Sequence, residues 1–466
     1  MNIGVNDQVN LFNEVLLNVF RNFIPHENIK CSYKDPPWMN KKVKKLLRKK
    51  NRLFKKYVSN GRLSQDEVIF RQATEEVSKL INDTKTAYFE KLGKKLNNPR
   101  TGPKTYWSIL KRFLNKAKIP SIPPLLEDGV FETDFKKKAG LFNIFFANQC
   151  NIFNNSSTLP EFTYKTEKRI NKITFSHDDI LKIINGLDSG KAHGHDGISI
   201  RMIKLCGKSI LHPLKLIFDS AFKEGAFPDC WKKGNIVPVH KKESKHLVKN
   251  YRPISLLPVF GKIFEKIIFN NLYEFFHSND LLSQHQSGFR IGDSCIYQLL
   301  SITHDIYRSF DGNPSHETRG VFLDMSKAFD KVWHEGLLFK LKSYGIEDKL
   351  LKILENYLYS RKQRVTLCGQ TSNWLEVNAG VPQGSVLGPL LFLVYINDLP
   401  DTLISSPRLF ADDTSIFSTV INVNRSSEAL NQDLALKDGH FSGKWLSIQT
   451  QPNKLWKFFF RTKPSL

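Results

Sequence analysis

The sequence predicts an α+β fold with a basic, helical amino-terminal part and a last third that mixes short strands with helices. Residues 39–99 place apolar side chains at helical spacing among lysines and arginines. Gly320–Asp324, Arg408–Ala411 and Ser415–Val420 are instead short apolar segments typical of strands. Apolar residues make up 41% and aromatic residues 12% of the 466 residues, which is the composition of a globular protein with a large core.

The charge distribution points to a polyanionic partner. The chain holds 69 Lys and Arg against 45 Asp and Glu, a net charge of +24. Residues 1–120 hold 26 Lys and Arg against 10 Asp and Glu, so this region carries +16 of the excess. Neutralising a phosphate backbone releases counterions and needs no special geometry, which favours a nucleic acid as partner. A solvated basic face on long helices is the alternative.

Cysteines and apolar runs indicate the compartment. The six cysteines show no CxxC pair and no spacing to histidine that would form a zinc site. The amino terminus lacks the pattern of a secretory signal. The longest apolar run, Val386–Ile396, is shorter than the ~20 residues of a spanning helix. We therefore expect an intracellular protein of the nucleus, the cytoplasm or both, with no membrane association.

Local patterns predict the individual elements. Residues 39–99 should form one or two long basic helices, followed by Pro- and Gly-containing breaks near 97–104 and 119–124. Ser176 should cap a helix that ends between Gly186 and Gly190. Further helices are predicted up to about Phe222 and over Leu256–Phe276, Lys331–Tyr344 and Leu387–Leu399, and strands over Ile236–Val239, Val365–Leu367 and Leu375–Val377, the last two as a pair.

Three aspartates stand where predicted strands end or turn. Asp324 closes an apolar strand, and Asp412 and Asp413 lie at the turn of a hairpin. Singly, Asp324 could be a helix cap, and adjacent acids in a turn could be merely solvated. Neighbouring like charges repel unless a cation neutralises them. Together the three suit two Mg²⁺ ions, with Mn²⁺ as a substitute, of the kind that support phosphoryl transfer to a primer hydroxyl.

Five sequence blocks resemble the reverse transcriptases of non-LTR retrotransposons, particularly the jockey-type elements of arthropods. Two blocks are similar to finger motifs of that family, Asn250–Ser255 and Gln286–Arg290. Three later blocks are similar to its motifs A, B and C, namely Asp324–Val332, Val381–Pro389 and Phe410–Asp413. All five occur in the family order. The resemblance extends from about Lys191 to Lys454. It implies a right-hand polymerase fold with fingers and palm.

The resemblance also implies a domain organisation. We expect a basic helical extension over 1–120, a helical spacer over 121–230, fingers over 231–320 and a palm over 321–466, with the reverse transcriptase domain at about 220–466. Residues 1–190 do not supply the acids and histidines of an endonuclease in a convincing arrangement. A helical thumb would begin after Lys454, and we expect it to be missing. The sequence therefore looks like a truncated copy, for which weak, distributive synthesis is expected.

Residue roles follow from the same resemblance. Asp324, Asp412 and Asp413 would bind the metal ions, and Arg252 and Lys241 would contact the incoming triphosphate. Gln383 and Gly384 would lie against the nucleotide, and Phe329 would exclude a 2′-hydroxyl. Lys454 would protonate the leaving pyrophosphate, although Leu455 stands where the family commonly has threonine. Without the family, Arg252 could be a surface ion pair and Phe329 a core residue.

The predicted function is RNA-directed DNA synthesis, with an RNA template, a DNA primer and deoxynucleoside triphosphates as partners. A nucleic-acid-binding remnant that no longer polymerises is the alternative. A maturase-like splicing cofactor is a third alternative. It is disfavoured because no maturase-type segment follows the palm in this sequence. The template, the target site and the oligomeric state remain open at the level of sequence.

Overall fold

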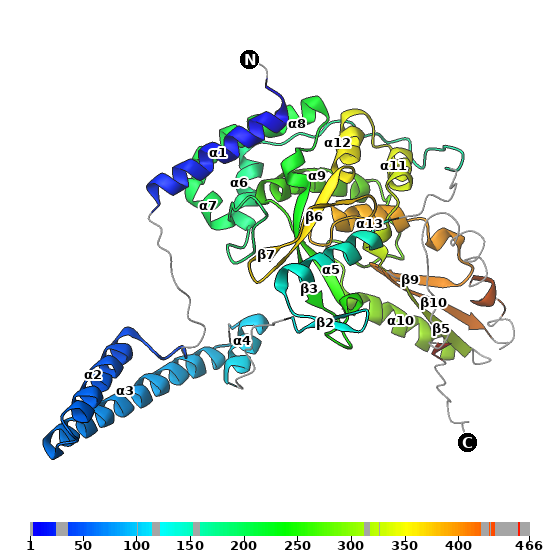
Figure 1. Cartoon of the computed structure of the whole chain (residues 1–466). Coiled ribbons are helices and arrows are strands. Elements are labelled where there is room, and N and C mark those ends of the chain that lie inside the picture. Colours follow the sequence, from blue (N-terminus) through cyan, green and yellow to red (C-terminus); the bar gives the residue numbers. More distant parts are fainter. Residues whose placement is uncertain are drawn as a thin grey trace, which may run out of the picture. The chain divides into compact units, whose positions relative to one another are not determined.

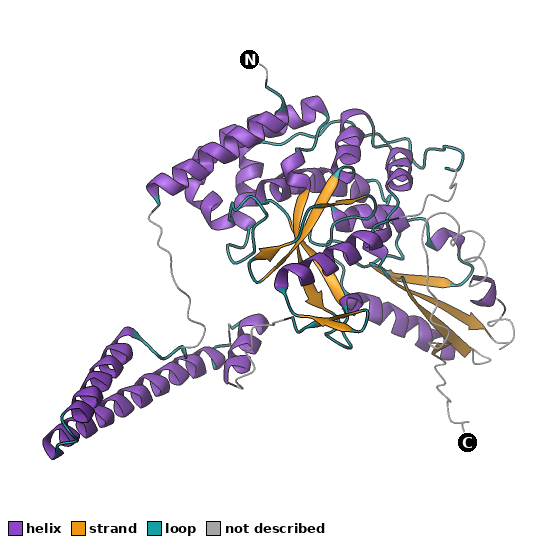
Figure 2. Cartoon of the chain, viewed as in Figure 1, coloured by secondary structure: helices purple, strands orange, loops and turns teal. Residues whose placement is uncertain are grey.

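A computed structural model describes residues 3–24, 36–99, 101–113, 122–151, 159–311, 317–325, 327–420, 428, 430–433 and 455–456. The chain divides into two compact units, a small one over Pro25–Ile122 and a large one made of Met1–Ile24 with Pro123–Leu466. Figure 1 labels the elements, and Figure 2 shows the mixture of helices and strands predicted from the sequence. No helix among the described residues is long and apolar enough to cross a membrane.

The small unit is a helical hairpin followed by one short helix. It consists of α2 (Lys41–Ser59), α3 (Ser64–Leu96) and α4 (Pro103–Phe113). Asn40 caps α2 by accepting a hydrogen bond from the Val43 amide, and the ring of Phe70 on α3 packs against Phe54 and Tyr57 of α2. The predicted long helices are thus confirmed, and there are two of them in this segment. Their charge differs, because α2 carries ten Lys and Arg and no acid, whereas α3 carries six of each sign.

Helices form most of the core of the large unit. They are α1 (Val5–Phe23), α5 (Phe135–Gln149), α6 (His177–Gly186), α7 (Ile200–Cys206), α8 (Leu211–Glu224), α9 (Val259–Ser278), α10 (Cys295–Phe310), α11 (His334–Ser343), α12 (Asp348–Leu358) and α13 (Gly388–Ile396). Short 3₁₀ turns lie at Gly207–Ile210, Asp229–Lys232, Val248–Asn250, Ala328–Lys331 and Pro400–Thr402. Every residue of α13 except Pro389 is buried, which explains why this helix is apolar on all sides.

Two helix boundaries illustrate the sequence predictions. Ser176 caps α6 through a capping box with Asp179, as expected. The helix predicted from Leu256 begins instead at Val259, after Pro258. A proline disfavours helical backbone in the residue before it, so the chain stays extended up to this point. The preceding segment, Tyr251–Leu256, is strand β4, which the sequence reading had missed.

One sheet combines strands from two distant regions. It contains β3 (Lys233–His240), β4, β6 (Arg361–Leu367), β7 (Gln370–Thr371) and β8 (Leu375–Val377), with β3 antiparallel to β4 and parallel to β6. The predicted strands at 365–367 and 375–377 exist, but β8 pairs with residues 361–363 of β6. Residues 366–367 pair with β7 instead, because Cys368 and Gly369 form a two-residue turn with positive φ.

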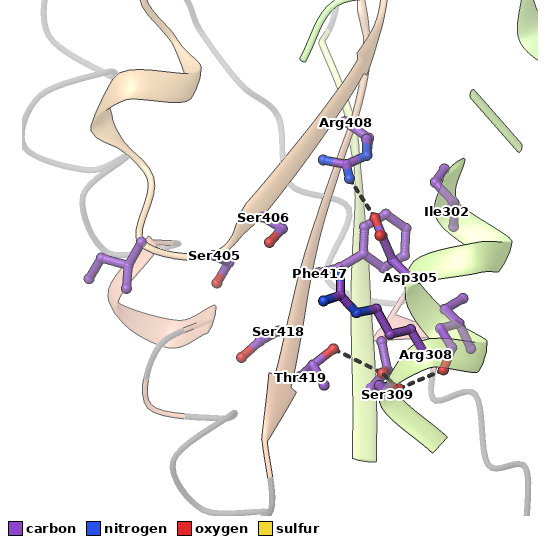
Figure 3. A pocket seen from close by; sticks show the side chains of 13 residues that line it. Ile302, Asp305, Arg308, Ser309, Ser405, Ser406, Arg408, Phe417, Ser418 and Thr419 are labelled. Atoms are coloured by element: carbon purple, nitrogen blue, oxygen red, sulfur yellow. Dashed lines mark hydrogen bonds and ion pairs between the residues drawn. The ribbon is translucent and has the colours of Figure 1, made fainter. Parts of the chain in front are cut away.

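A second sheet carries the acidic residues. Its order is β11 (Leu455–Trp456), β5 (Glu317–Asp324), β10 (Asp413–Val420) and β9 (Ser406–Phe410), and all neighbours are antiparallel. A small hairpin of β1 (Leu125–Glu127) and β2 (Val130–Glu132) lies elsewhere in the unit. Helix α10 flanks the acidic sheet across a cleft of about 540 Å³, where Arg408 pairs with Asp305 (Figure 3).

Candidate active site

The acidic residues lie at the closed end of a tight hairpin. Phe410 of β9 pairs with Asp413 of β10, which leaves Ala411 and Asp412 as the two turn residues. Ala411 has a φ of 57°, the left-handed backbone that such turns require. Asp412 is half-buried and Asp413 is exposed. The hairpin predicted from the sequence, with two carboxylates at its turn, is therefore confirmed.

The third aspartate is directly across the sheet from this turn. In the antiparallel register of β5 and β10, Asp324 is the partner of Asp413. Directly opposed residues of such strands are about 4.5–5.5 Å apart at their Cα atoms. The backbone thus brings Asp324 next to Asp412 and Asp413, which follow it by almost ninety positions in the chain. The structure describes the backbone of Asp324 and not its side chain, and the side chains it does describe form no cluster of three or more metal ligands.

The segment His285–Gly288 holds the hairpin turn from one side. Leu409 of β9 exchanges backbone hydrogen bonds with it, donating to His285 O at 2.8 Å and accepting from Ser287 N at 2.9 Å. The side chain of Gln286 is only 4% exposed and reaches the turn itself. Its Oε1 accepts from Ala411 N at 2.8 Å and from Gly288 N at 2.7 Å, and its Nε2 donates to Ala411 O at 3.3 Å. The sequence reading assigned no role to Gln286.

Gly288 permits this contact. A Cβ atom at this position would lie 2.1 Å from Ala411 N, closer than real Cβ atoms approach. The glycine is therefore explained by the close approach of two backbones. The block Gln286–Arg290, which sequence resemblance linked to the fingers, lies in the structure against the turn that carries Asp412.

Backbone contacts join the loop after Asp324 to the segment that contains Gln383. Gly380 N donates to Val332 O, and Val381 N donates to Phe329 O, both at 2.8 Å. Gly380 has a φ of 84°, and a Cβ atom there would lie 2.7 Å from the carbonyl oxygens of Phe329 and Asp330. The loop after Asp324 and the segment that begins at Gly380 thus form one continuous surface, although about fifty residues separate them in the chain. We call this surface the wall of the site.

Gln383 and Gly384 link this wall to strand β4. Gln383 donates from Nε2 to Asp330 Oδ1 at 2.9 Å, and its carbonyl oxygen accepts from Ser255 N at 2.8 Å. Gly384 has a φ of 119°, and a Cβ atom there would lie 2.6 Å from Ser255 O. The turn therefore requires glycine for both conformation and space. Gln383 itself is half-buried.

Asp330 is a buried acid within the same wall. Its side chain is 7% exposed, and this burial raises its pKa to about 6, while the hydrogen bond from Gln383 and the nearby charge of Lys327 act in the opposite direction. Burial likewise raises the pKa of the Cys150 thiol and lowers the pKa of the Lys327 amine. The acid, the amine and the thiol form a polar group behind Gln383.

Phe329 is part of an aromatic stack. Its ring lies 4.4 Å from that of Phe392 in a stacked arrangement and 6.0 Å from that of Phe289 in an edge-on arrangement. The side chain is half-buried. It is therefore anchored on the core and retains some exposed surface.

Arg252 and Lys241 lie side by side on the β3–β4 hairpin. Arg252 pairs with Val239 in the register, and Lys241 N donates to Asn250 O at 2.9 Å. Both side chains are exposed. Neither forms an ion pair or hydrogen bond with any side chain in the described part of the protein. The alternative that Arg252 forms a surface ion pair therefore finds no acidic partner among the described residues.

Two buried side chains that the sequence reading had missed support the wall. His334 Nε2 lies 2.8 Å from Gly380 O, and burial lowers its pKa to about 4, so the ring is neutral and Nε2 carries the proton. Glu265 accepts from Val386 N at 2.6 Å and from Leu387 N at 3.1 Å at the start of α13. Burial raises the pKa of Glu265. Neither side chain belongs to a recognisable sequence pattern.

Lys454 lies outside the described residues. Its neighbours Leu455 and Trp456 form β11, which pairs with Val321 and Gly320 at the edge of the acidic sheet.

Comparison with known proteins relates the central part of this chain to a protein family. Residues 239–437 match the family described as reverse transcriptase (RNA-dependent DNA polymerase). This range includes β4, the Gln286 segment, all three aspartates and the Gln383 turn. The chain thus contains a reverse transcriptase domain.

Its relatives are proteins of mobile elements. The chain is 29% identical over 411 residues to the RNA-directed DNA polymerase from mobile element jockey of Drosophila melanogaster. The aligned region covers 84% of this chain and 44% of the relative. The probable RNA-directed DNA polymerase from transposon BS is 26% identical over 417 residues, 85% of this chain and 45% of the relative. That from transposon X-element is 31% identical over 277 residues, 58% of this chain and 30% of the relative. Both are also from Drosophila melanogaster.

The matched family is the one that the sequence motifs indicated, and the wider similarity is to polymerases of mobile elements. The chain spans a little under half the length of the jockey and BS proteins that it matches.

Proposed function

We propose that this protein is an RNA-directed DNA polymerase that extends a DNA primer on an RNA template with deoxynucleoside triphosphates. The observation that carries the proposal is the hairpin register, which brings Asp324 opposite Asp413 with Asp412 beside it in the turn. The match to the reverse transcriptase family and the jockey-type relatives supports the same reaction. In this proposal the acidic sheet is the palm, and the β3–β4 hairpin belongs to the fingers.

The three aspartates fit two Mg²⁺ ions by the chemistry of their donors. Carboxylate oxygens are the ligands that such hard cations prefer, and Asp412 and Asp413 place two of them on adjacent residues. When bound, the ions lower the pKa of the primer hydroxyl and neutralise charge on the leaving pyrophosphate. The acidic residues hold this site at the end of a rigid hairpin, where the reacting oxygen atoms would be aligned.

The nucleotide would be held by residues from both sheets. Arg252 and Lys241 offer exposed cationic donors to the triphosphate, and a guanidinium can contact two phosphate oxygens at once. Gln383, fixed by Asp330 and by the Ser255 amide, would lie against the nucleotide, with Gly384 permitting close backbone approach. Phe329, supported by Phe392, would be placed below the sugar and would exclude a 2′-hydroxyl.

The small unit would add affinity for RNA without sequence specificity. Helix α2 carries ten cationic side chains and no acidic one, which suits contacts with a phosphate backbone. Because α3 has equal numbers of basic and acidic residues, we assign this role to α2 and not to α3. We expect the protein to act in the nucleus, the cytoplasm or both, where its substrates occur.

Primer extension tests the proposal directly. Purified full-length protein, Mg²⁺, a DNA primer on an RNA template and all four deoxynucleoside triphosphates should yield products whose sequence follows the template. Chelation of the metal, or omission of the nucleotide that the template specifies next, should stop synthesis at the expected position. Tight RNA binding without any extension would instead support a nucleic-acid-binding remnant.

A further inference from the structure

The geometry points to Gln286 and Gly288 as positioning residues that set the shape of the acidic turn. This inference rests on the proposed function, because it concerns how the metal-binding aspartates are held. Gln286 is buried, and its side-chain hydrogen bonds go to the backbone of Ala411 and Gly288, so it acts through the backbone of the turn. It is therefore a support of the site and not a catalytic residue.

The turn that carries Asp412 is strained at Ala411. Ala411 adopts a φ of 57°, which an L-residue with a Cβ atom populates at a cost. Asp412 follows immediately, so any relaxation of Ala411 towards ordinary backbone would rotate the Asp412 carboxylate away from its place. The turn needs contacts that favour the left-handed conformation over the relaxed one.

Gln286 supplies these contacts on both sides of the same residue. Its Oε1 accepts from Ala411 N at 2.8 Å, and its Nε2 donates to Ala411 O at 3.3 Å, so the amide grips both polar groups of the strained residue. The second bond to Oε1, from Gly288 N at 2.7 Å, fixes the amide itself. With 4% of Gln286 exposed, water does not compete for these bonds.

Gly288 makes the grip geometrically attainable. Its α-carbon lies so near the turn that a Cβ atom would be 2.1 Å from Ala411 N and 2.8 Å from the carbonyl carbon of Phe410. Any side chain here would push the segment off the hairpin. The two residues thus act together, because Gly288 allows the segment to lie close to the turn and Gln286 forms the hydrogen bonds to it.

Two substitutions at Gln286 separate hydrogen bonding from packing. Gln286→Met keeps the volume and removes all three hydrogen bonds, whereas Gln286→Glu keeps an acceptor for the two amides but, when ionised, loses the donor and places a buried negative charge beside the acidic turn. Because misplacement of a catalytic group by about 1 Å can cost roughly 100-fold in rate, we expect kcat to fall about 10- to 100-fold in Gln286→Met. Gln286→Glu should recover part of this loss at lower pH, where the protonated carboxyl group can accept from the two amides and donate to Ala411 O. The KM for nucleotide and the Kd for primer–template should stay unchanged.

Metal binding provides a readout that does not depend on turnover. Binding of Mn²⁺ to the full-length protein, followed by the loss of the free-ion signal in electron paramagnetic resonance, should be weaker in Gln286→Met and in Gly288→Ala than in the wild type. Asn356→Leu is the control for the loss of an amide that supports a backbone, since its Oδ1 accepts from Phe227 N at 2.9 Å and neither residue belongs to the acidic sheet or to the wall. Gly140→Ala is the control for the glycine, since a Cβ atom there meets nothing within 4 Å.

The outcomes separate this inference from the proposed function. A wild type that neither binds Mn²⁺ nor extends primers overturns the proposed function and the inference together. A wild type that does both, with Gln286→Met and Gly288→Ala equal to it in kcat and in Mn²⁺ affinity, leaves the function standing and overturns the positioning role. Loss of thermal stability without any change in those two quantities would likewise reduce Gln286 to a structural residue.

Discussion

Burial of Asp330 behind Gln383 should make the stability of this protein depend on pH in an unusual direction. The pKa of Asp330 is about 6 in the folded protein and 3.8 in its ordinary state, because burial disfavours the charged carboxylate. Between these values the folded protein retains a proton that the unfolded chain releases. The contribution of this group is therefore fully present below pH 3.8 and is lost as pH rises through about 6.

The size of the effect follows from the two pKa values. At about 1.4 kcal/mol for each pH unit that separates them, the total is about 3 kcal/mol. Asp330→Asn removes the titration and keeps an acceptor for the Nε2 group of Gln383. Relative to the wild type, the free energy of unfolding of Asp330→Asn should thus rise by about 2–3 kcal/mol between pH 4 and pH 7.5.

Urea unfolding at several pH values, followed by tryptophan fluorescence, measures this difference. Asp179→Asn is a control of opposite sign, because its hydrogen bonds from the Ser176 backbone and side chain lower the pKa of Asp179. The contribution of Asp179 is present above its ordinary pKa and is lost as pH falls. If the stability difference between Asp330→Asn and the wild type were the same at every pH, the burial argument for Asp330 would be wrong.

Three further predictions concern the substrates. The first replaces Lys41, Lys44, Lys45 and Lys49 of α2 by glutamine, which should lower the slope of log affinity for RNA against log salt by up to about 0.7 for each lost phosphate contact. Arginine at the same positions is the control. An unchanged slope in filter-binding assays would show that α2 does not contact the RNA. Phe329→Ala should admit ribonucleotides, as measured by the ratio of kcat/KM for matched ribo- and deoxynucleotides, and unaltered discrimination would return Phe329 to the core. Arg252→Ala should lower kcat/KM for deoxynucleotides about 10- to 100-fold, since a charge-assisted hydrogen bond contributes about 1.5–3 kcal/mol, and Lys241→Ala should have a smaller effect; equal activity of Arg252→Ala and wild type would contradict the phosphate role.

Sequence alone predicted the parts of this site whose signal is local. The acidic hairpin was predictable because two apolar strands flank Asp412 and Asp413 within a dozen residues. The cap at Ser176 and the two long helices of the small unit rest on equally local patterns. Strand β4 escaped notice because it is short and merges into the apolar run of α9, from which Pro258 separates it.

The supporting contacts could not be read from the sequence, because their partners are far apart in the chain. Gln286 meets Ala411 across 125 positions, and Gln383 meets Asp330 across 53. A polar residue in a loop gives no indication of its burial until the tertiary structure places another backbone against it. The same holds for His334, whose neutral state follows from burial. The resemblance to reverse transcriptases marked some of these blocks without assigning a physical role to Gln286.

The central claim is that DNA synthesis occurs at the acidic turn, and the rate of single-nucleotide addition in Asp412→Asn tests it most directly. Wild-type protein and the variant are bound in excess to the same RNA template and DNA primer, and one nucleotide is added with Mg²⁺. Because the substitution removes the charge of a proposed metal ligand and leaves the basic surfaces intact, addition should fall by orders of magnitude while the Kd for primer–template stays the same. Addition by Asp412→Asn at the wild-type rate would contradict the account.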